Sequence, residues 1–227
     1  MFCSNAAYTQ STADVNRENI SIAANQLFTV AGQPFVKNKF SKLVEGSPFF
    51  NENFMQGAII LSQGREYKYK LVRLNLLETQ VNYIDESGTE LVATTPLQEV
   101  VLWDTLHKTD HRFVLSYFIE AEKAPEKDFY ELLQTGAAQL YKQHKKAMIE
   151  TQQYGNATYE QKVLTETRYF ILHNKKWLRI KKLKDLPETL SDKKKELQQF
   201  IATKKLSGDS EENFAAVVGY YNGLFQE

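Results

Sequence analysis

Potential metal ligands are densest in residues 104–111, which include Asp104, His107, Asp110 and His111. Imidazole nitrogens and carboxylate oxygens bind zinc, and the two histidines, four residues apart, would share one face of a helix. Such a site would support a small metal-dependent hydrolase. A zinc site, however, needs three or four ligands that outer hydrogen bonds hold in place, and this segment is predicted to join two strands. A polar hairpin connection is therefore the interpretation that we favour.

A basic stretch towards the C-terminus is the second candidate site. Lysines beside an aromatic ring could bind anionic lipid head groups or a surface polysaccharide. Alternating cationic and apolar residues are also typical of a half-buried strand with a solvated outer side. We favour this second interpretation, because antiparallel sheets commonly face water on one side. The residues concerned are Lys175, Lys176, Trp177, Arg179, Lys181, Lys182 and Lys184.

The charge is balanced overall but not along the chain. The 227 residues include 28 basic and 28 acidic side chains. Residues 162–206 carry 13 basic and 5 acidic side chains, a local balance of +8, whereas the segments before and after each have a balance of −4. A zero total gives no whole-molecule attraction for nucleic acid. Nucleic acid is therefore not the partner that we expect.

Catalytic motifs are absent from the sequence. It has no Gly-x-Ser-x-Gly elbow, Walker loop, dinucleotide-binding fingerprint or His-Glu-x-x-His motif. Its neighbouring carboxylates occur at predicted strand ends and helix starts, where turns and caps account for them. The single cysteine, Cys3, excludes an intramolecular disulfide and any multi-cysteine metal site. We therefore assign no catalytic residue and no cofactor, and we expect a protein that is not an enzyme.

Strands must position most of these candidates. Residues 27–119 are dense in aromatic and β-branched residues and are punctuated by Gly, Pro and Asn. Turns centred on Gly64 and on residues 86–89 predict hairpins, and a further strand is predicted over residues 111–119. Connections this short force antiparallel neighbours. The pattern predicts a meander.

One strand of this region has an internal change of parity. Tyr67 and Tyr69 lie on one side of the strand, whereas Val72 and Leu74 fall on the other. A β-bulge near residues 71–72 would bring both sets to the core side.

The C-terminal part is predicted to change from strands to helices. Residues 137–151 fit helical spacing as well as a strand, and the neighbouring turn and later β segments favour the strand. The last 40 residues predict two amphipathic helices, the first capped by Ser191 and the second opened by Asp209 and Glu212 as a capping box. The two helices would cover one face of the preceding sheet.

The predicted fold class is α+β, mainly β, with an antiparallel β-meander, roll or sandwich-like body and two C-terminal amphipathic helices. We expect a lead-in over residues 1–24, a β-rich domain over 25–185 and a helical closure over 186–227. The length and the 42% hydrophobic content suffice for one large core. The sequence contains no run of about 18 apolar residues, so no transmembrane helix is predicted.

The first residues resemble the end of a signal peptide. Ser4 and Ala6 have the small side chains that a signal peptidase needs three positions and one position before its cut, although the charged start and the apolar stretch are missing. A start codon upstream of Met1 would make the protein exported or periplasmic. The alternative is a cytoplasmic protein with a disordered N-terminus.

Several packing and turn phrases of the sequence resemble a group of exported proteins from Bacteroidota-type bacteria. The resemblance covers most of the chain from about Leu43. It implies an envelope or periplasmic location and a mainly β fold, and it brings no assigned activity and no functional residues. The phrases are Gly46-Ser47-Pro48-Phe49-Phe50, the strand that begins at Gly57, Glu90-Leu91-Val92-Ala93-Thr94-Thr95-Pro96, Leu190-Ser191-Asp192-Lys193-Lys194-Lys195-Glu196-Leu197 and Tyr220-Tyr221-Asn222.

The function that we expect is an exported, non-enzymatic binding or structural module of the bacterial envelope, whose partner would be another envelope protein or an anionic surface polymer. The alternatives are the metal-dependent hydrolase at residues 104–111 and an anionic-surface binder at residues 175–184.

Overall fold

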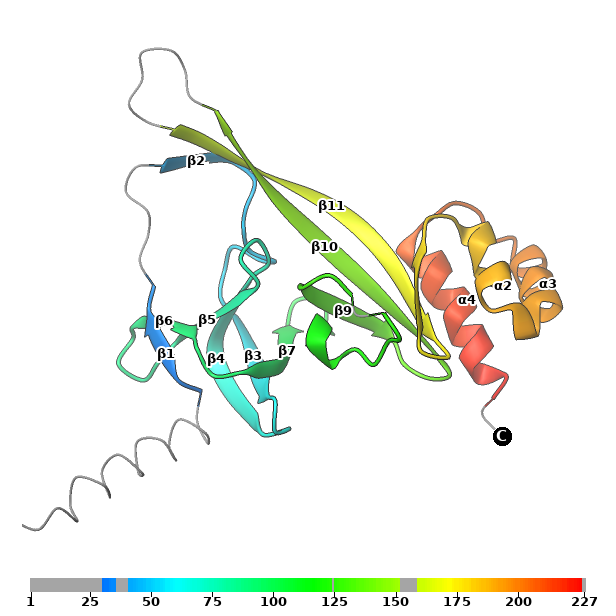
Figure 1. Cartoon of the computed structure of the whole chain (residues 1–227), viewed down its shortest axis with the longest axis horizontal. Helices are drawn as coiled ribbons and strands as arrows, with labels where there is room; N and C mark the ends of the chain where they lie inside the picture. The colour runs from blue at the N-terminus through cyan, green and yellow to red at the C-terminus, as the bar shows by residue number, and fades with distance from the viewer. Residues whose placement is uncertain (1–29, 36–40, 124, 152–158, 226–227) are drawn as a thin grey trace, which may run out of the picture.

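The computed structural model describes residues 30–35, 41–123, 125–151 and 159–225, and this part of the chain is mainly β (Figure 1). The predicted lead-in and signal-peptide remnant lie outside the described residues. The strands are β1 (Gly32–Pro34), β2 (Ser41–Glu45), β3 (Met55–Leu61), β4 (Glu66–Asn75), β5 (Gln80–Ile84), β6 (Glu90–Ala93), β7 (Leu97–Asp104), β8 (Thr109–Leu115), β9 (Phe129–Gln134), β10 (Ala138–Thr151), β11 (Tyr159–His173) and β12 (Lys176–Ile180).

All of these strands belong to one sheet. Its order is β1-β6-β5-β4-β3-β7-β8-β9-β10-β11-β12, and the pairs along this path are antiparallel. β2 adds to β11 in parallel. Two of the predicted turns place glycine in the left-handed region that residues with a Cβ resist, Gly64 at φ 78° and Gly88 at φ 83°. The sheet and its two longer C-terminal helices confirm the predicted fold class.

The predicted β-bulge in β4 is present. Met55 pairs with Val72, but Gly57 pairs with Tyr69, so β4 has one residue more than β3 between these two pairs. The extra residue reverses the parity, and both Tyr69 and Val72 contact the same core. Leu71, at the bulge itself, remains 42% exposed.

The strand predicted over residues 111–119 is too long, because β8 ends at Leu115 and Ser116–Phe118 forms a short 3-10 helix, η1. The segment leading into β9 causes this change. The Ser116 amide donates to the carbonyl oxygen of Asp128 at 2.9 Å, and the Asp128 amide donates to Ser116 Oγ at 3.3 Å. Tyr117 consequently lies in solvent, 86% exposed.

The ambiguous segment at residues 137–151 is a strand, as favoured. β10 pairs with β11 along its whole length, from Ala138 opposite His173 to Thr151 opposite Glu160. The partner strand, which follows a connection of several residues, decides between two patterns that are both locally acceptable.

Alternation along the strands sorts the apolar side chains into three cores. The first core lies within the N-terminal part of the sheet and includes Phe113. The second core lies between β10, β11 and the helices and includes Leu140. Tyr141, the next residue of β10, points to the opposite face and belongs to the third core.

The helices cover the second core (Figure 1). α4 lies against β9 and β10, and α3 packs against α2 and α4. None of the described helices is long and apolar enough to cross a membrane. The helical segments are η2 (Leu183–Asp185), α2 (Leu186–Thr189), η3 (Ser191–Lys193), α3 (Lys194–Lys204) and α4 (Glu211–Gly223).

Both predicted helix caps are wrong. Ser191 lies inside η3, and no side-chain cap opens either η3 or α3. At α4 the cap is Ser210, whose Oγ accepts a hydrogen bond from the Asn213 amide at 3.3 Å. Asp209 instead accepts a hydrogen bond from the Leu183 amide at 2.8 Å, so it joins two helical segments.

The longest strands extend beyond the rest of the molecule (Figure 1). Residues 145–151 of β10, residues 159–167 of β11 and β2 together are called the arm below. Gly46 connects the arm to the body in a left-handed conformation, φ 76°, and a Cβ at this position would overlap the carbonyl oxygen of Val163. Glycine is therefore required where β2 leaves the arm.

Candidate functional site

The structure places two of the predicted metal ligands in the β7–β8 turn. The Asp104 carboxylate accepts hydrogen bonds from the amides of Leu106 and His107, both at 3.0 Å, and contacts His107 Nδ1 at 2.6 Å. These bonds close the turn and hold the pKa of Asp104 below its usual range. The His107 side chain is 76% exposed.

The other two predicted ligands do not join Asp104 and His107. Asp110 and His111 are consecutive residues of β8, so their side chains point to opposite faces of the sheet. His111 turns inward and pairs with Glu131. The described residues contain no group of three or more histidine, cysteine or acidic side chains that could hold a metal ion.

The basic stretch is divided between a core and the surface. Trp177 belongs to the third core, where its ring stacks on Phe170 at 5.0 Å and contacts Tyr130 edge-on at 5.2 Å. Arg179 pairs with Glu166 at 2.9 Å. The remaining cations of the stretch are exposed: Lys175, Lys176, Lys181, Lys182 and Lys184. The tryptophan is therefore engaged in packing rather than offered beside the lysines.

A recess on the same face as the third core has a volume of about 460 Å³. Its lining includes Lys175 and Glu120, and also Arg112 and Glu99, which bind each other through two hydrogen bonds at 2.5 and 2.8 Å. Cations and carboxylates therefore share the recess, so it offers no uniformly positive surface for a polyanion. A small polar molecule is the kind of ligand that it could accommodate.

A buried ionisable cluster lies on the opposite face, between the first and second cores. Its centre is Glu131 of β9, whose side chain is only 6% exposed. One carboxylate oxygen contacts His111 Nδ1 at 2.6 Å, and the other contacts His144 Nε2 at 2.7 Å. Lys142 lies 3.9 Å from the same carboxylate and 2.6 Å from Glu211 at the start of α4.

Electrostatics keep the Glu131 carboxyl at the centre of this cluster ionised. Burial favours the neutral form of Glu131, but the hydrogen bonds from His111 and His144 outweigh it and hold the pKa of the carboxyl at about 2. The hydrogen bond with Glu131 raises the pKa of His111, against the effect of its own burial. The Phe50 ring contacts both imidazoles, with centroids 4.9 and 5.3 Å away.

A histidine oriented by a carboxylate is the arrangement of a general base, yet here both histidines are packed beneath an aromatic ring. The recess lies on the other face of the sheet, and His111, Glu131 and His144 are not among its lining residues. The cluster joins β8, β9 and β10 and, through Lys142, the start of α4. Its geometry fits a polar structural core between two apolar ones.

The arm carries the most unusual surface. Apart from the buried Val163, its large apolar side chains are exposed on both faces, because consecutive residues of a strand point in opposite directions. Met148 and Ile149 are 44% and 45% exposed, and Leu164 is 49% exposed. β2 adds Leu43 and Val44, at 43% and 40%. This surface is the candidate interaction site.

Sequence reasoning missed both the cluster and the arm. A glutamate between Tyr130 and Leu132, inside an otherwise apolar strand, is the signal that marks Glu131 as a buried charge in need of partners. The run Ala147-Met148-Ile149 is the signal for the arm, since a strand with one solvated face would alternate.

Comparisons with known proteins found no matching family model, no matching curated protein and no matching solved structure.

Proposed function

We propose that this protein is an exported, non-enzymatic binding module of the bacterial envelope, and that the arm is its contact surface for another protein molecule. The observation that carries the proposal is the exposure of Leu43, Val44, Met148, Ile149 and Leu164 on one projecting element. Clustered exposed apolar side chains are typical of protein interaction sites.

The construction of the arm supports this role. Ion pairs and hydrogen bonds between its own strands, such as Lys162 with Glu45 at 2.9 Å and Gln161 with Glu150 at 2.5 Å, stabilise its shape without covering the apolar residues. A surface that is ordered before binding loses less conformational entropy on association. The body, by contrast, buries most of its apolar residues in three cores, and those that it exposes, such as Leu71 and Tyr117, come singly from different elements.

Two features of the sequence support the envelope location. Ser4 and Ala6 have the spacing of a signal-peptidase site, and the quoted packing phrases resemble exported proteins of Bacteroidota-type bacteria. Expression from the native locus, upstream DNA included, followed by cell fractionation tests this part. Recovery in the envelope fractions is expected, and recovery in the cytoplasm alone would contradict it.

Photo-crosslinking in living cells tests the contact surface. A benzoylphenylalanine at position 164 samples the arm, and the same residue at position 117 is the matched control, because Tyr117 is 86% exposed on η1 in the body. We expect a protein adduct from position 164 and none from position 117. Adducts from position 117 alone, or from neither position, would overturn the proposed contact surface.

A further inference from the structure

The outer edge of the arm is an unpaired strand edge. On the side away from β11, β10 pairs with β9 only through Leu140, Tyr141 and Lys142. Lys145 is still occupied by the segment before β9, with Glu126 at 3.2 Å and Asp128 at 3.8 Å. From Lys146 to Thr151, β10 has β11 as its only strand partner among the described residues.

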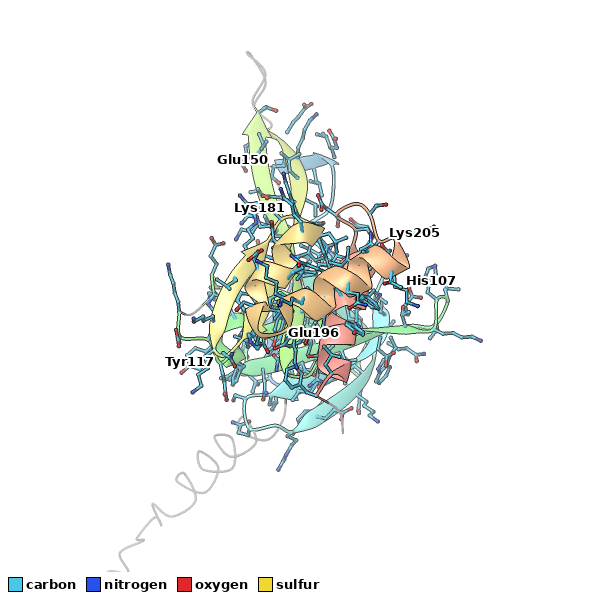
Figure 2. All side chains as sticks on the ribbon, turned by 90° about the vertical axis from the view of Figure 1, so that its right-hand side faces the viewer. His107, Tyr117, Glu150, Lys181, Glu196 and Lys205 are labelled. Atoms are coloured by element: carbon cyan, nitrogen blue, oxygen red, sulfur yellow. The ribbon has the colours of Figure 1, made fainter. Side chains whose placement is uncertain are left out.

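Such an edge is a template for one more strand. Its backbone N–H and C=O groups can bind a strand from another molecule, and apolar flanking side chains favour this addition. Natural edges are often protected by charges or proline, but the centre of this one is Ala147, Met148 and Ile149. Figure 2 shows Glu150 near the free end of the arm, away from Glu196 of α3 and from Lys205, the residue after α3.

The residues of this edge are complementary to themselves. In an antiparallel pair related by a two-fold axis, the continuous pleat requires that one residue faces its own copy. With Met148 at the axis, Lys146 faces Glu150 of the other copy, and Ala147 faces Ile149. Two ion pairs then flank an apolar centre, which is a favourable set of cross-strand pairs.

Neighbouring registers are worse. With Ala147 at the axis, Lys146 faces Met148 and Lys145 faces Ile149. With Ile149 at the axis, Met148 faces Glu150. Both place a charged group opposite an apolar one, so only the register centred on Met148 pairs opposite charges with each other and apolar residues with each other.

We propose that the partner of the arm is a second copy of this chain, added antiparallel along residues 146–150 of β10 with Met148 at the two-fold axis. This inference rests on the proposed function and names the occupant of the same surface. The two arms form one continuous sheet, β2-β11-β10 followed by β10-β11-β2 of the other copy. Leu164, opposite Ala147 in β11, then lies in the same row as Ile149 of the other copy.

A charge swap in the full chain tests this register. Each single variant, Lys146→Glu or Glu150→Lys, places like charges opposite each other twice per dimer. We expect each to raise the dimer dissociation constant about tenfold or more in sedimentation velocity, measured over a concentration series. The double variant Lys146→Glu with Glu150→Lys restores opposite charges, so its dissociation constant is expected to return to within about threefold of wild type.

A disulfide test keeps the proposal falsifiable if the charge variants disturb the arm. In a Cys3→Ser background, Met148→Cys is expected to form a covalent dimer on mild oxidation, because facing residues of an antiparallel pair are close enough for a disulfide. Leu164→Cys is the matched control on the adjacent strand and is expected to remain monomeric.

Some results would overturn the self-pairing without touching the proposed function. A monomeric wild-type chain at all concentrations, single charge variants that associate as wild type, or equal oxidation of both cysteine variants would do so. If position 164 then crosslinks to a different protein in cells, the arm remains the contact surface and only its occupant is wrong.

Discussion

The Glu131 cluster and the arm are opposite departures from the usual distribution of polar and apolar residues. In the body, a carboxylate and two histidines lie between hydrophobic cores, and each finds a partner within 2.7 Å. In the arm, the apolar side chains of Met148, Ile149 and Leu164 are 44–49% exposed. The body is therefore complete within one chain, whereas the arm presents a surface that a second molecule can complete.

The largest expected effect is the removal of Glu131. Glu131→Ala leaves the half-buried His111 and His144 without their carboxylate, whereas Lys142 keeps its pair with Glu211 at 2.6 Å. Loss of one partner of a buried charge cluster costs about 3–5 kcal/mol, and we expect this decrease in the free energy of unfolding in urea. Glu126→Ala is the matched control, because its pair with Lys145 is exposed and worth less than about 1 kcal/mol. Equal losses in the two variants would contradict a structural role for the cluster.

Asn222 comes next, because it joins α4 to the β9–β10 turn. Its Oδ1 accepts from the Ala138 amide at 2.8 Å, and its Nδ2 donates to the carbonyl oxygens of Thr135 and Ala138 at 2.9 Å each. Asn222→Ala leaves the buried Ala138 amide and carbonyl and the part-buried Thr135 carbonyl without this partner, at a cost of about 2–3 kcal/mol by denaturant unfolding. Asn213→Ala is the exposed comparison and should cost less. The reverse order would show that the helices are not fastened to the sheet here.

The free energy of unfolding should depend on pH. His111 has a raised pKa in the folded protein, so its contribution to stability is present below about pH 6.5 and is lost as the pH rises through the raised value. Glu131 has a lowered pKa, so its contribution is present above about pH 4.5 and is lost as the pH falls towards 2. Burial raises the pKa of Asp128, which offsets part of the loss on the acid side.

The free energy of unfolding should therefore be greatest between about pH 4.5 and 6.5. Urea denaturation at a series of pH values measures it, and Glu131→Ala should flatten the profile. A wild-type maximum above pH 8 would contradict the effects assigned to His111 and Glu131.

Arm substitutions should separate association from stability. Leu164→Ser and Ile149→Thr remove exposed apolar groups, so the free energy of unfolding at low protein concentration should change by less than about 0.5 kcal/mol. The same variants should weaken association through the arm, seen as reduced dimer formation in sedimentation velocity. A loss of stability comparable with that of Asn222→Ala would place these residues in a core instead.

The smallest effect is expected in the β7–β8 turn. His107→Ala leaves the two backbone hydrogen bonds to Asp104 intact, so stability should change by less than about 0.5 kcal/mol. Elemental analysis of the purified protein with and without this substitution tests the metal-site alternative. Zinc that is bound by the wild-type protein and lost in His107→Ala would support that alternative.

The sequence alone predicted features that depend on neighbouring residues. The bulge in β4 followed from the parity of Tyr69 and Val72, and the turn at Gly64 from its own conformational freedom. Features that depend on distant partners were not predictable in the same way. Asp128 ends β8 at Leu115, and Leu183 binds Asp209, which leaves Ser210 as the cap of α4. In each case a residue far along the chain decides between locally acceptable patterns.

The candidate sites also differ in whether neighbouring residues or distant partners determine them. A local cluster of ligand types suggested residues 104–111, but strand alternation sends Asp110 and His111 to opposite faces. No acidic residue or histidine adjoins Glu131 in the sequence, and its hydrogen-bond partners come from β8 and β10. The exposure of the arm depends on where β9 and the helices stop covering β10, which local patterns do not encode.

Hydrogen exchange as a function of protein concentration is the most direct test of the arm as a contact surface. We predict that amides in residues 146–151 become protected as concentration rises, while those of β12, at the opposite end of the strand order from β1, keep a constant rate. The contradicting result has two parts. Exchange in residues 146–151 would not change with the concentration of the protein itself, and it would not change when a protein that crosslinks at position 164 is added. Together these results would contradict the assignment of the arm as a contact surface.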